Sequence, residues 1–169
     1  MSPFAYIARA RGEKRLKKLT TKKDVVAMAR KLGAAVQTFI PIMPRGMTHN
    51  DLEAYVYHKD GHAMAAIRKG DKLRAAEMAL IPYVERAAPK RPLTGRIRQR
   101  VKYCFATKGK HKQGEPMDRP PDIDNMTKTL NDLCERFGYI ANDCRVVDFS
   151  AIKVYADPAG IFVRFEEIV

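Results

Sequence analysis

The chain has 169 residues, with 32 Lys or Arg and 19 Asp or Glu, which gives a net charge of +13 at pH 7. Its length suits one domain with an ordinary hydrophobic core, and so basic a surface attracts polyanions. No apolar run reaches the roughly 18 residues of a membrane span, and the N-terminus has no apolar signal segment, so we expect a cytoplasmic protein without a membrane partner. The three cysteines form no CxxC pair, which argues against a disulfide framework and a zinc site.

Residues 1–35 are predicted to be a basic N-terminal extension of the folded domain, which would span residues 36–169. One short helix, capped by Thr20 or Thr21, is expected within it. The charge run from Arg9 to Lys23 fits either an arm that grips DNA or a solvated tail, and the pattern leaves both interpretations open.

Three short segments at the start of the domain have strand patterns. Residues 36–43 are strand-like, and their prolines confine the strand to a sheet edge or a strand end. Residues 54–56 form a second strand, and the Asp60-Gly61 turn leads into a partner strand over residues 63–67. That last segment fits a helix equally well.

The next segment, residues 71–88, has the periodicity of an amphipathic helix. Asp71 is the expected cap, and Pro82 is expected to kink the helix. Five apolar residues would form its buried face: Leu73, Ala76, Leu80, Ile81 and Val84.

The strongest basic segment lies between Arg86 and Glu115, which enclose no acid. Four of its cations alternate with mostly apolar residues, so a strand would present all four on one face: Arg96, Arg98, Arg100 and Lys102. A solvated sheet face normally mixes both signs, so we expect this row to contact DNA phosphates. The loop that follows adds three lysines expected to bind DNA: Lys108, Lys110 and Lys112.

A second helix is predicted after the Pro120-Pro121 pair, with Gly138 at its end. Its apolar residues recur at steps of three and four and would bury one face: Ile123, Met126, Leu130, Leu133 and Phe137.

Acids gather around this helix at spacings that a packed core does not need. Asp124 and Lys128 lie on a neighbouring face, Asp122 lies beside them, and Asp143 opens a later strand. If that strand packs next to the helix start, the three aspartates converge, and only a cation would keep them ionised together. Mg²⁺ suits such a ligand set. Alternatively, Asp124 is a cap or first-turn acid and Lys128 is its exposed partner, a pairing of about 0.3–0.5 kcal/mol.

The motif carries a resemblance to a known family. Pro121, Asp122, Ile123, Asp124 and Asn125 are followed by Lys128 four residues, and by Asp143 nineteen residues, after the second aspartate. This string resembles the RusA family of Holliday-junction resolvases. The resemblance implies that Asp122, Asp124, Lys128 and Asp143 form the active site, with the three aspartates as metal ligands. The family often has two adjacent acids where this chain has Asn142 and Asp143.

The order of the predicted elements implies an α+β fold, a single domain with one mixed β-sheet and packed helices, as in the RusA family. Residues 146–155 and 161–168 are expected to form an antiparallel hairpin around the turn at residues 157–160. Lys153 on the first of these strands matches a basic position of the family and is added to the predicted DNA-binding residues.

The resemblance further implies a Mg²⁺-dependent endodeoxyribonuclease, with Mn²⁺ as a substitute, that resolves Holliday junctions and related branched DNA by paired phosphodiester nicks. It also implies a homodimer, because symmetric cuts on two strands require two sites related by a two-fold axis. The alternative is a non-catalytic basic nucleic-acid-binding protein that retains the family fold.

Overall fold

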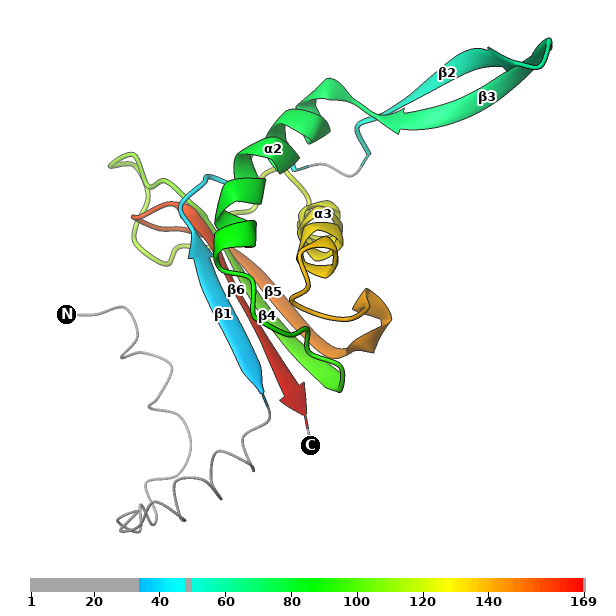
Figure 1. Ribbon diagram of the computed structural model, residues 1–169. Coiled ribbons are helices and arrows are strands. Elements are labelled where there is room, and N and C mark those ends of the chain that lie inside the picture. The colour runs from blue at the N-terminus through cyan, green and yellow to red at the C-terminus, as the bar shows by residue number, and fades with distance from the viewer. Residues whose placement is uncertain (1–33, 48–49, 169) are drawn as a thin grey trace. The chain divides into compact units, whose positions relative to one another are not determined.

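The computed structural model describes residues 34–47 and 50–168. The helix expected within the N-terminal extension and its charge run lie outside the described residues. The predicted α+β fold is confirmed (Figure 1), with these elements in chain order: β1 (Ala35–Ile40), β2 (Leu52–Lys59), β3 (His62–Lys69), α2 (Asp71–Arg86), β4 (Arg96–Phe105), α3 (Ile123–Arg136), a 3₁₀ turn (Asp143–Arg145), β5 (Val146–Tyr155) and β6 (Gly160–Ile168).

Four strands form the main sheet, in the order β1-β6-β4-β5. β6 is antiparallel to both β1 and β4, whereas β5 is parallel to β4, so the sheet is mixed. The expected hairpin of β5 and β6 is wrong, because β4 lies between them. α3 carries the chain from the end of β4 back to the start of β5, as a parallel pair requires, and β6 then takes the other side of β4.

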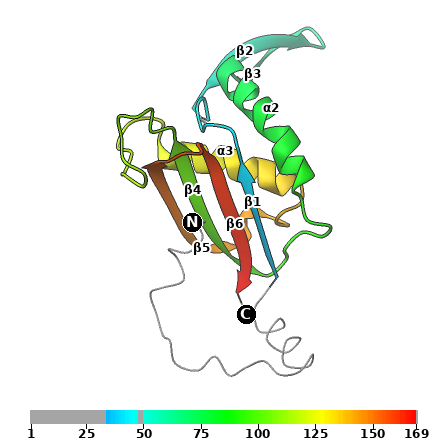
Figure 2. The same cartoon turned by 90° about the vertical axis from the view of Figure 1, so that its left-hand side faces the viewer.

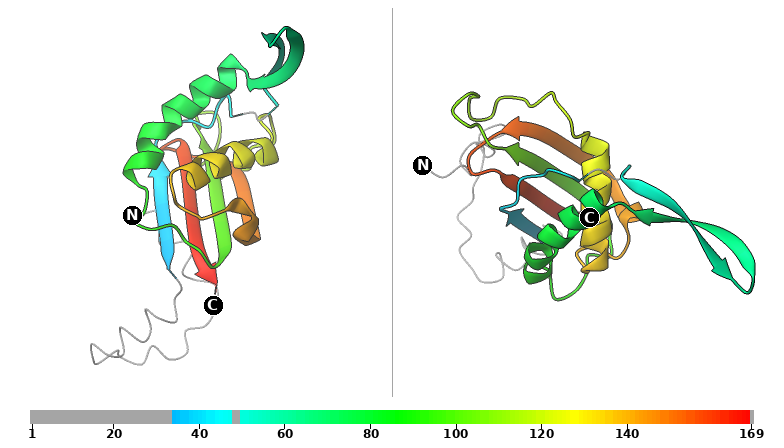
Figure 3. Two further views of the ribbon diagram at one scale, coloured as in Figure 1. Left: turned by 45° about the vertical axis from the view of Figure 1, so that its right-hand side comes forward. Right: turned by 90° about the horizontal axis from the view of Figure 1, so that it is seen from above.

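Both helices lie on one face of this sheet (Figures 2 and 3). The side chains of Ile97, Val101 and Tyr103 on β4 point to that face and are at most 4 % exposed. The Tyr103 hydroxyl lies 3.1 Å from Thr127 Oγ1 of α3. The predicted apolar stripe of α3 completes the core, and full burial of each such side chain contributes about 1.5–3 kcal/mol.

The start of α2 is capped from a distant residue and not by the predicted Asp71. Gly70 occupies the N-cap position, and the Leu73 N–H donates to Asp51 Oδ2 at 2.9 Å. Asp71 is exposed and instead pairs with Arg74, one turn along the helix. Local spacing could not reveal this cap, because its acceptor comes from 22 residues earlier in the chain.

β2 and β3 form a separate two-stranded antiparallel ribbon around the Asp60-Gly61 turn, which confirms the predicted hairpin (Figure 1). Its side chains are largely exposed on both faces, with Val56 at 66 % and Ile67 at 71 %. Neither helix among the described residues is long and apolar enough to cross a bilayer.

Candidate active site and nucleic-acid interface

Two of the predicted active-site acids open α3. Asp122 is the N-cap residue with an extended backbone, and its carboxylate makes no capping bond. Asp124 lies in the first turn, and both residues are exposed. Within residues 34–47 and 50–168, neither carboxylate forms a hydrogen bond or an ion pair. Neither carboxylate therefore holds the helix through a hydrogen bond or an ion pair.

Lys128 follows one turn after Asp124 on the same exposed side of α3. The two side chains form no ion pair in the described part of the chain. Asp124 is thus a first-turn acid, as the alternative allowed, but it is neither a cap nor the ion-pair partner of Lys128 in the described part of the chain. An ammonium that no neighbouring acid neutralises stays free to attract an anion.

The backbone before α3 is held by Lys153 of β5. Lys153 is in register with Tyr103, so its side chain lies on the helix-bearing face of the sheet. Its Nζ donates to the carbonyl oxygens of Arg119 at 2.8 Å and Pro121 at 2.9 Å. These bonds join β5 to the segment that leads into Asp122, a structural contact that no local pattern in the sequence indicates.

The residues just before this segment, 115–117, pair with the outer edge of β5. Pro116 forms an antiparallel bridge with Val154, and the Met117 N–H donates to the Lys153 carbonyl at 3.1 Å. The Tyr155 N–H donates to the Glu115 carbonyl at 2.8 Å. The start of α3 is therefore fixed to the sheet by backbone bonds as well as by the Lys153 ammonium.

Asp143 lies at the opposite end of α3. Its backbone N–H donates to Glu135 Oε2 at 3.1 Å, in the last turn of the helix. Asp122 and Glu135 are 13 residues apart, or about 20 Å along a helix. The expected convergence of Asp122, Asp124 and Asp143 within one chain is therefore wrong, and the described residues contain no group of three acidic, histidine or cysteine side chains able to hold a metal.

The packing of the helix explains this separation. β5 is parallel to β4, so its first residue lies far from the end at which α3 begins, and only the end of α3 reaches it.

Asn142, where the family often has an acid, has a structural role here. Its Oδ1 accepts from the Cys144 N–H at 3.1 Å, and its Nδ2 donates to Glu135 Oε1 at 3.2 Å.

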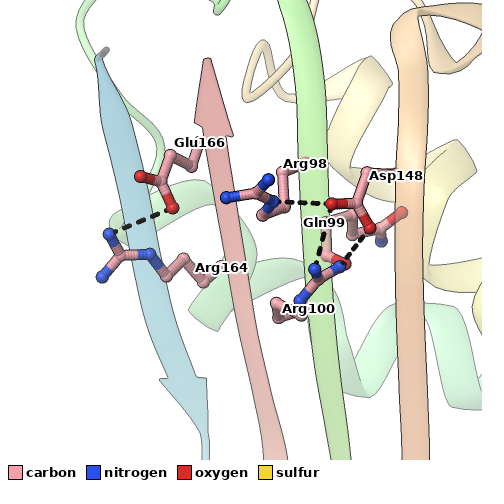
Figure 4. Close-up of polar contacts among 6 residues, drawn as sticks. All are labelled: Arg98, Gln99, Arg100, Asp148, Arg164 and Glu166. Carbon is pink, nitrogen blue, oxygen red and sulfur yellow. Dashed lines mark hydrogen bonds and ion pairs between the residues drawn. The ribbon is translucent and has the colours of Figure 1, made fainter. Parts of the chain in front are cut away.

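The predicted row of cations lies on β4 as expected, on the sheet face turned away from the helices. Figure 4 shows that this face mixes both signs, contrary to the expectation. Asp148 Oδ2 accepts from Arg98 Nε at 2.6 Å, and its Oδ1 accepts from Arg100 Nη1 at 2.8 Å. These bonds, first that of Arg100 and then that of Arg98, lower the pKa of Asp148 to about 2.

The loop after β4 presents its cations differently. Lys108, Lys110 and Lys112 are exposed and pair with no acid in the described ranges. Two further arginines that sequence reasoning did not single out are exposed near them, Arg45 and Arg119. Arg119 precedes the acidic motif directly, and its position could have been noticed, whereas nothing in the sequence around Arg45 connects it to this loop.

The residues at the start of α3 fit a Mg²⁺ ion. Asp122 and Asp124 offer carboxylate oxygens that no other described group uses, and both are open to solvent. Mg²⁺ in enzymes is commonly held by one or two carboxylates together with substrate phosphate and water. Lys128 adds a positive charge within reach of such a phosphate.

The comparison with known families agrees with the fold and with this motif. The family model for endodeoxyribonuclease RusA matches residues 41–166, which is more than half of the chain and includes Asp122, Asp124, Lys128 and Asp143. A search among curated proteins found no match. The α+β architecture, with a mixed four-stranded sheet and two helices in the described part, is consistent with the family fold. The chain belongs to the endodeoxyribonuclease RusA family.

Proposed function

We propose that this protein is a Mg²⁺-dependent endodeoxyribonuclease that resolves Holliday junctions and related branched DNA by paired nicks. One observation carries the proposal: in a member of an endodeoxyribonuclease family, two exposed carboxylates without a structural partner open a helix whose start is tied to the sheet. The preference for four-way junctions follows from the resemblance of the PDIDN motif to the RusA resolvases.

Asp122 and Asp124 would hold the ion, for which Mn²⁺ can substitute. When bound, the ion supplies Lewis acidity and lowers the pKa of water for attack on the phosphodiester. Lys128 stabilises negative charge on the phosphate oxygens from one turn further along α3. Lys153 keeps the backbone of both acids in place through the carbonyls of Arg119 and Pro121.

Asp143 enters this site from a second copy of the chain. It is too far along α3 to reach its own Asp122, yet it is exposed and its carboxylate has no partner among the described residues. In a homodimer with a two-fold axis, two copies exchange equivalent surfaces, so each would supply Asp143 to the other. Two such composite sites would make the paired nicks that symmetric resolution requires.

The first test is strand nicking of a synthetic four-way junction beside a linear duplex of the same sequence, in Mg²⁺ or EDTA. Asp124→Asn should reduce nicking of the junction by ~10²–10³-fold, the size of effect seen when one transition-state contact is removed. Asp132→Asn is the matched control, because Asp132 lies two turns further along α3 and outside the proposed site. It should nick like the wild type.

Tight binding of both DNAs without cleavage in Mg²⁺ or Mn²⁺ would reject the enzyme hypothesis. The alternative, a basic nucleic-acid-binding protein with the family fold, would then remain. Metal-dependent cutting of the linear duplex as fast as the junction would retain the nuclease and reject the junction preference.

Mixing two inactive variants tests the shared site. Heterodimers of Asp124→Asn and Asp143→Asn copies contain one site with both changes and one intact site, so the mixture should recover single-strand nicking that each variant lacks alone. If all acids of a site came from one chain, no intact site would form. A mixture as inactive as its components, with subunit exchange verified by differently tagged copies, contradicts the composite site.

A further inference from the structure

A cleft of about 290 Å³ opens beside the start of α3. Its walls come from four parts of the chain: the segment after β1, the end of β4 with the loop that follows, the segment before the acidic motif, and the end of β5. Figure 2 shows that the loop after β4 and the start of α3 lie at the same end of the sheet. Neither the proposed metal site nor the predicted cation row accounts for this cleft.

Four cations line the cleft, and no acid does: Arg45, Lys108, Lys110 and Arg119. None of them forms an ion pair with another described residue, in contrast to Arg98 and Arg100 on β4. Like charges gathered without a counter-charge repel one another, so an anion that enters the cleft relieves that repulsion. The ligand is therefore expected to carry at least one phosphate-like negative charge.

The rest of the lining is mostly apolar and includes two stacked rings. His111 is stacked on Tyr155, with ring centroids 3.6 Å apart and an angle of 2° between the rings. His111 Nδ1 also lies 2.8 Å from Glu115 Oε1, so the imidazole is held in one orientation. Met117 and Phe105 add buried apolar surface to the cleft. A planar ring that is held in place suits a ligand with an aromatic face.

The position of the cleft connects it to the acids. Arg119 and Pro121 form part of its wall, Asp122 is the next residue, and Lys153 holds the carbonyls of both wall residues. A DNA strand with one phosphodiester at Asp122 would therefore have a neighbouring nucleotide at the cleft. A ligand that carries both an anionic group and a planar group, and that lies next to this phosphodiester, is a nucleotide.

We propose that this cleft binds one unstacked deoxynucleotide of the strand to be cut, with its phosphate among the four cations and its base against His111. This inference rests on the proposed function for the identity of the strand. It adds a site of base contact next to the acids, through which the protein would sense strand separation at a branch point and the identity of one base.

The test uses a single-stranded tetranucleotide that carries one 2-aminopurine, titrated with the full chain in EDTA so that no cleavage occurs. Binding should change the 2-aminopurine fluorescence. Lys110→Ala should weaken binding and reduce the slope of log affinity against log salt by about 0.7, the value for one lost phosphate contact to a single strand. Lys90→Ala is the matched control, since Lys90 is exposed, does not line the cleft and is not among the predicted DNA-binding residues.

His111→Ala should retain the salt dependence and lose most of the fluorescence change, because it removes the ring and leaves the cations. The free 2-aminopurine deoxynucleoside monophosphate, as a second probe, should bind more weakly because it lacks flanking phosphates. A monophosphate that binds more tightly than the tetranucleotide would assign the cleft to free nucleotides and overturn the proposal.

Other results overturn it as well. They are an absence of binding, binding without a fluorescence change, and equal losses of affinity in Lys110→Ala and Lys90→Ala. Junction nicking by the same preparations separates this inference from the proposed function. Junction nicking without a fluorescence change of the tetranucleotide rejects the nucleotide site in the cleft but retains the nuclease. A fluorescence change without junction nicking rejects the nuclease and leaves a binding site for single-stranded DNA.

Discussion

Two groups of cations in this protein look alike in the sequence and differ in the structure. Arg98 and Arg100 on β4 both bond to Asp148, and they lie on the sheet face turned away from the helices. Lys108 and Lys110 in the following loop have no acidic partner among the described residues, and they line a cleft beside the helix that carries Asp122. The first group helps to join two strands, and the second is available to a ligand.

A count of positive charges in the sequence therefore does not locate a phosphate-binding surface. A cation that already shares a carboxylate must exchange that partner for a phosphate, and the exchange cancels part of the gain. A cation without a partner gains from any phosphate that approaches. The side of the sheet matters equally, because the acids and the start of α3 lie on the face that the β4 arginines do not reach.

Among the cations, the largest effect is expected from Lys153, which connects the cleft wall to the acids. Lys153→Met removes both bonds to the carbonyls of Arg119 and Pro121 and should lower junction nicking in Mg²⁺ by ~10–100-fold, as for residues that orient metal ligands. Junction binding in EDTA should change little. Lys153→Arg should recover part of the activity, and Lys90→Met is the control, because Lys90 is exposed and lies outside the cleft and the predicted DNA-binding set. Equal losses of binding and nicking would instead make Lys153 a DNA contact.

An intermediate effect should separate the two groups directly. The double variant Lys108→Ala/Lys110→Ala should weaken junction binding and reduce the salt slope by about 0.9 for each lost phosphate contact. Arg98→Ala/Arg100→Ala should change this slope less, because Asp148 already engages both arginines. The measurement is binding affinity across a salt series in EDTA. A larger change of slope in the arginine variant would reverse the comparison and restore the β4 row as the main phosphate contact.

The smallest effect concerns stability and its dependence on pH. Because Arg100 and Arg98 lower the pKa of Asp148 from 3.8 to about 2 in the folded state, the carboxylate contributes stability above about pH 4, and this contribution disappears as the pH falls towards 2. Asp148→Asn should therefore lower the urea midpoint of unfolding relative to the wild type at pH 7. This difference between the two midpoints should shrink below pH 4. A difference that stays constant between pH 7 and pH 2.5 would show that the ion pairs are not its cause.

Most of the local structure could be predicted from the sequence. The apolar stripe of α3 and Gly138 after it indicated the helix that the structure contains, and the alternation on β4 predicted which residues are buried. The hairpin of β2 and β3 followed from the Asp60-Gly61 turn. These features depend on residues within one turn or one strand of each other, so their causes are visible in a short window of the chain.

The candidate site could be predicted in part. The residue types and their spacing pointed to Asp122, Asp124 and Lys128, and the structure leaves all three exposed and without partners in its described part. The sequence did not indicate Lys153, whose bonds span 32 and 34 residues. It also could not separate Asp143 from the other acids, because its distance from them depends on the direction in which β5 runs.

The family and the element order follow from the sequence alone, and a local motif predicts which residues would carry the chemistry, since all of these depend on composition, periodicity and short-range spacing. Only the three-dimensional arrangement shows that β4 lies between β5 and β6, that Asp148 pairs with two of the predicted DNA-binding arginines, and that Asp143 is at the far end of α3. Each of these depends on which strands pair and in which direction. Strand pairing depends on which arrangement buries the apolar face of the whole sheet, and no single segment determines it.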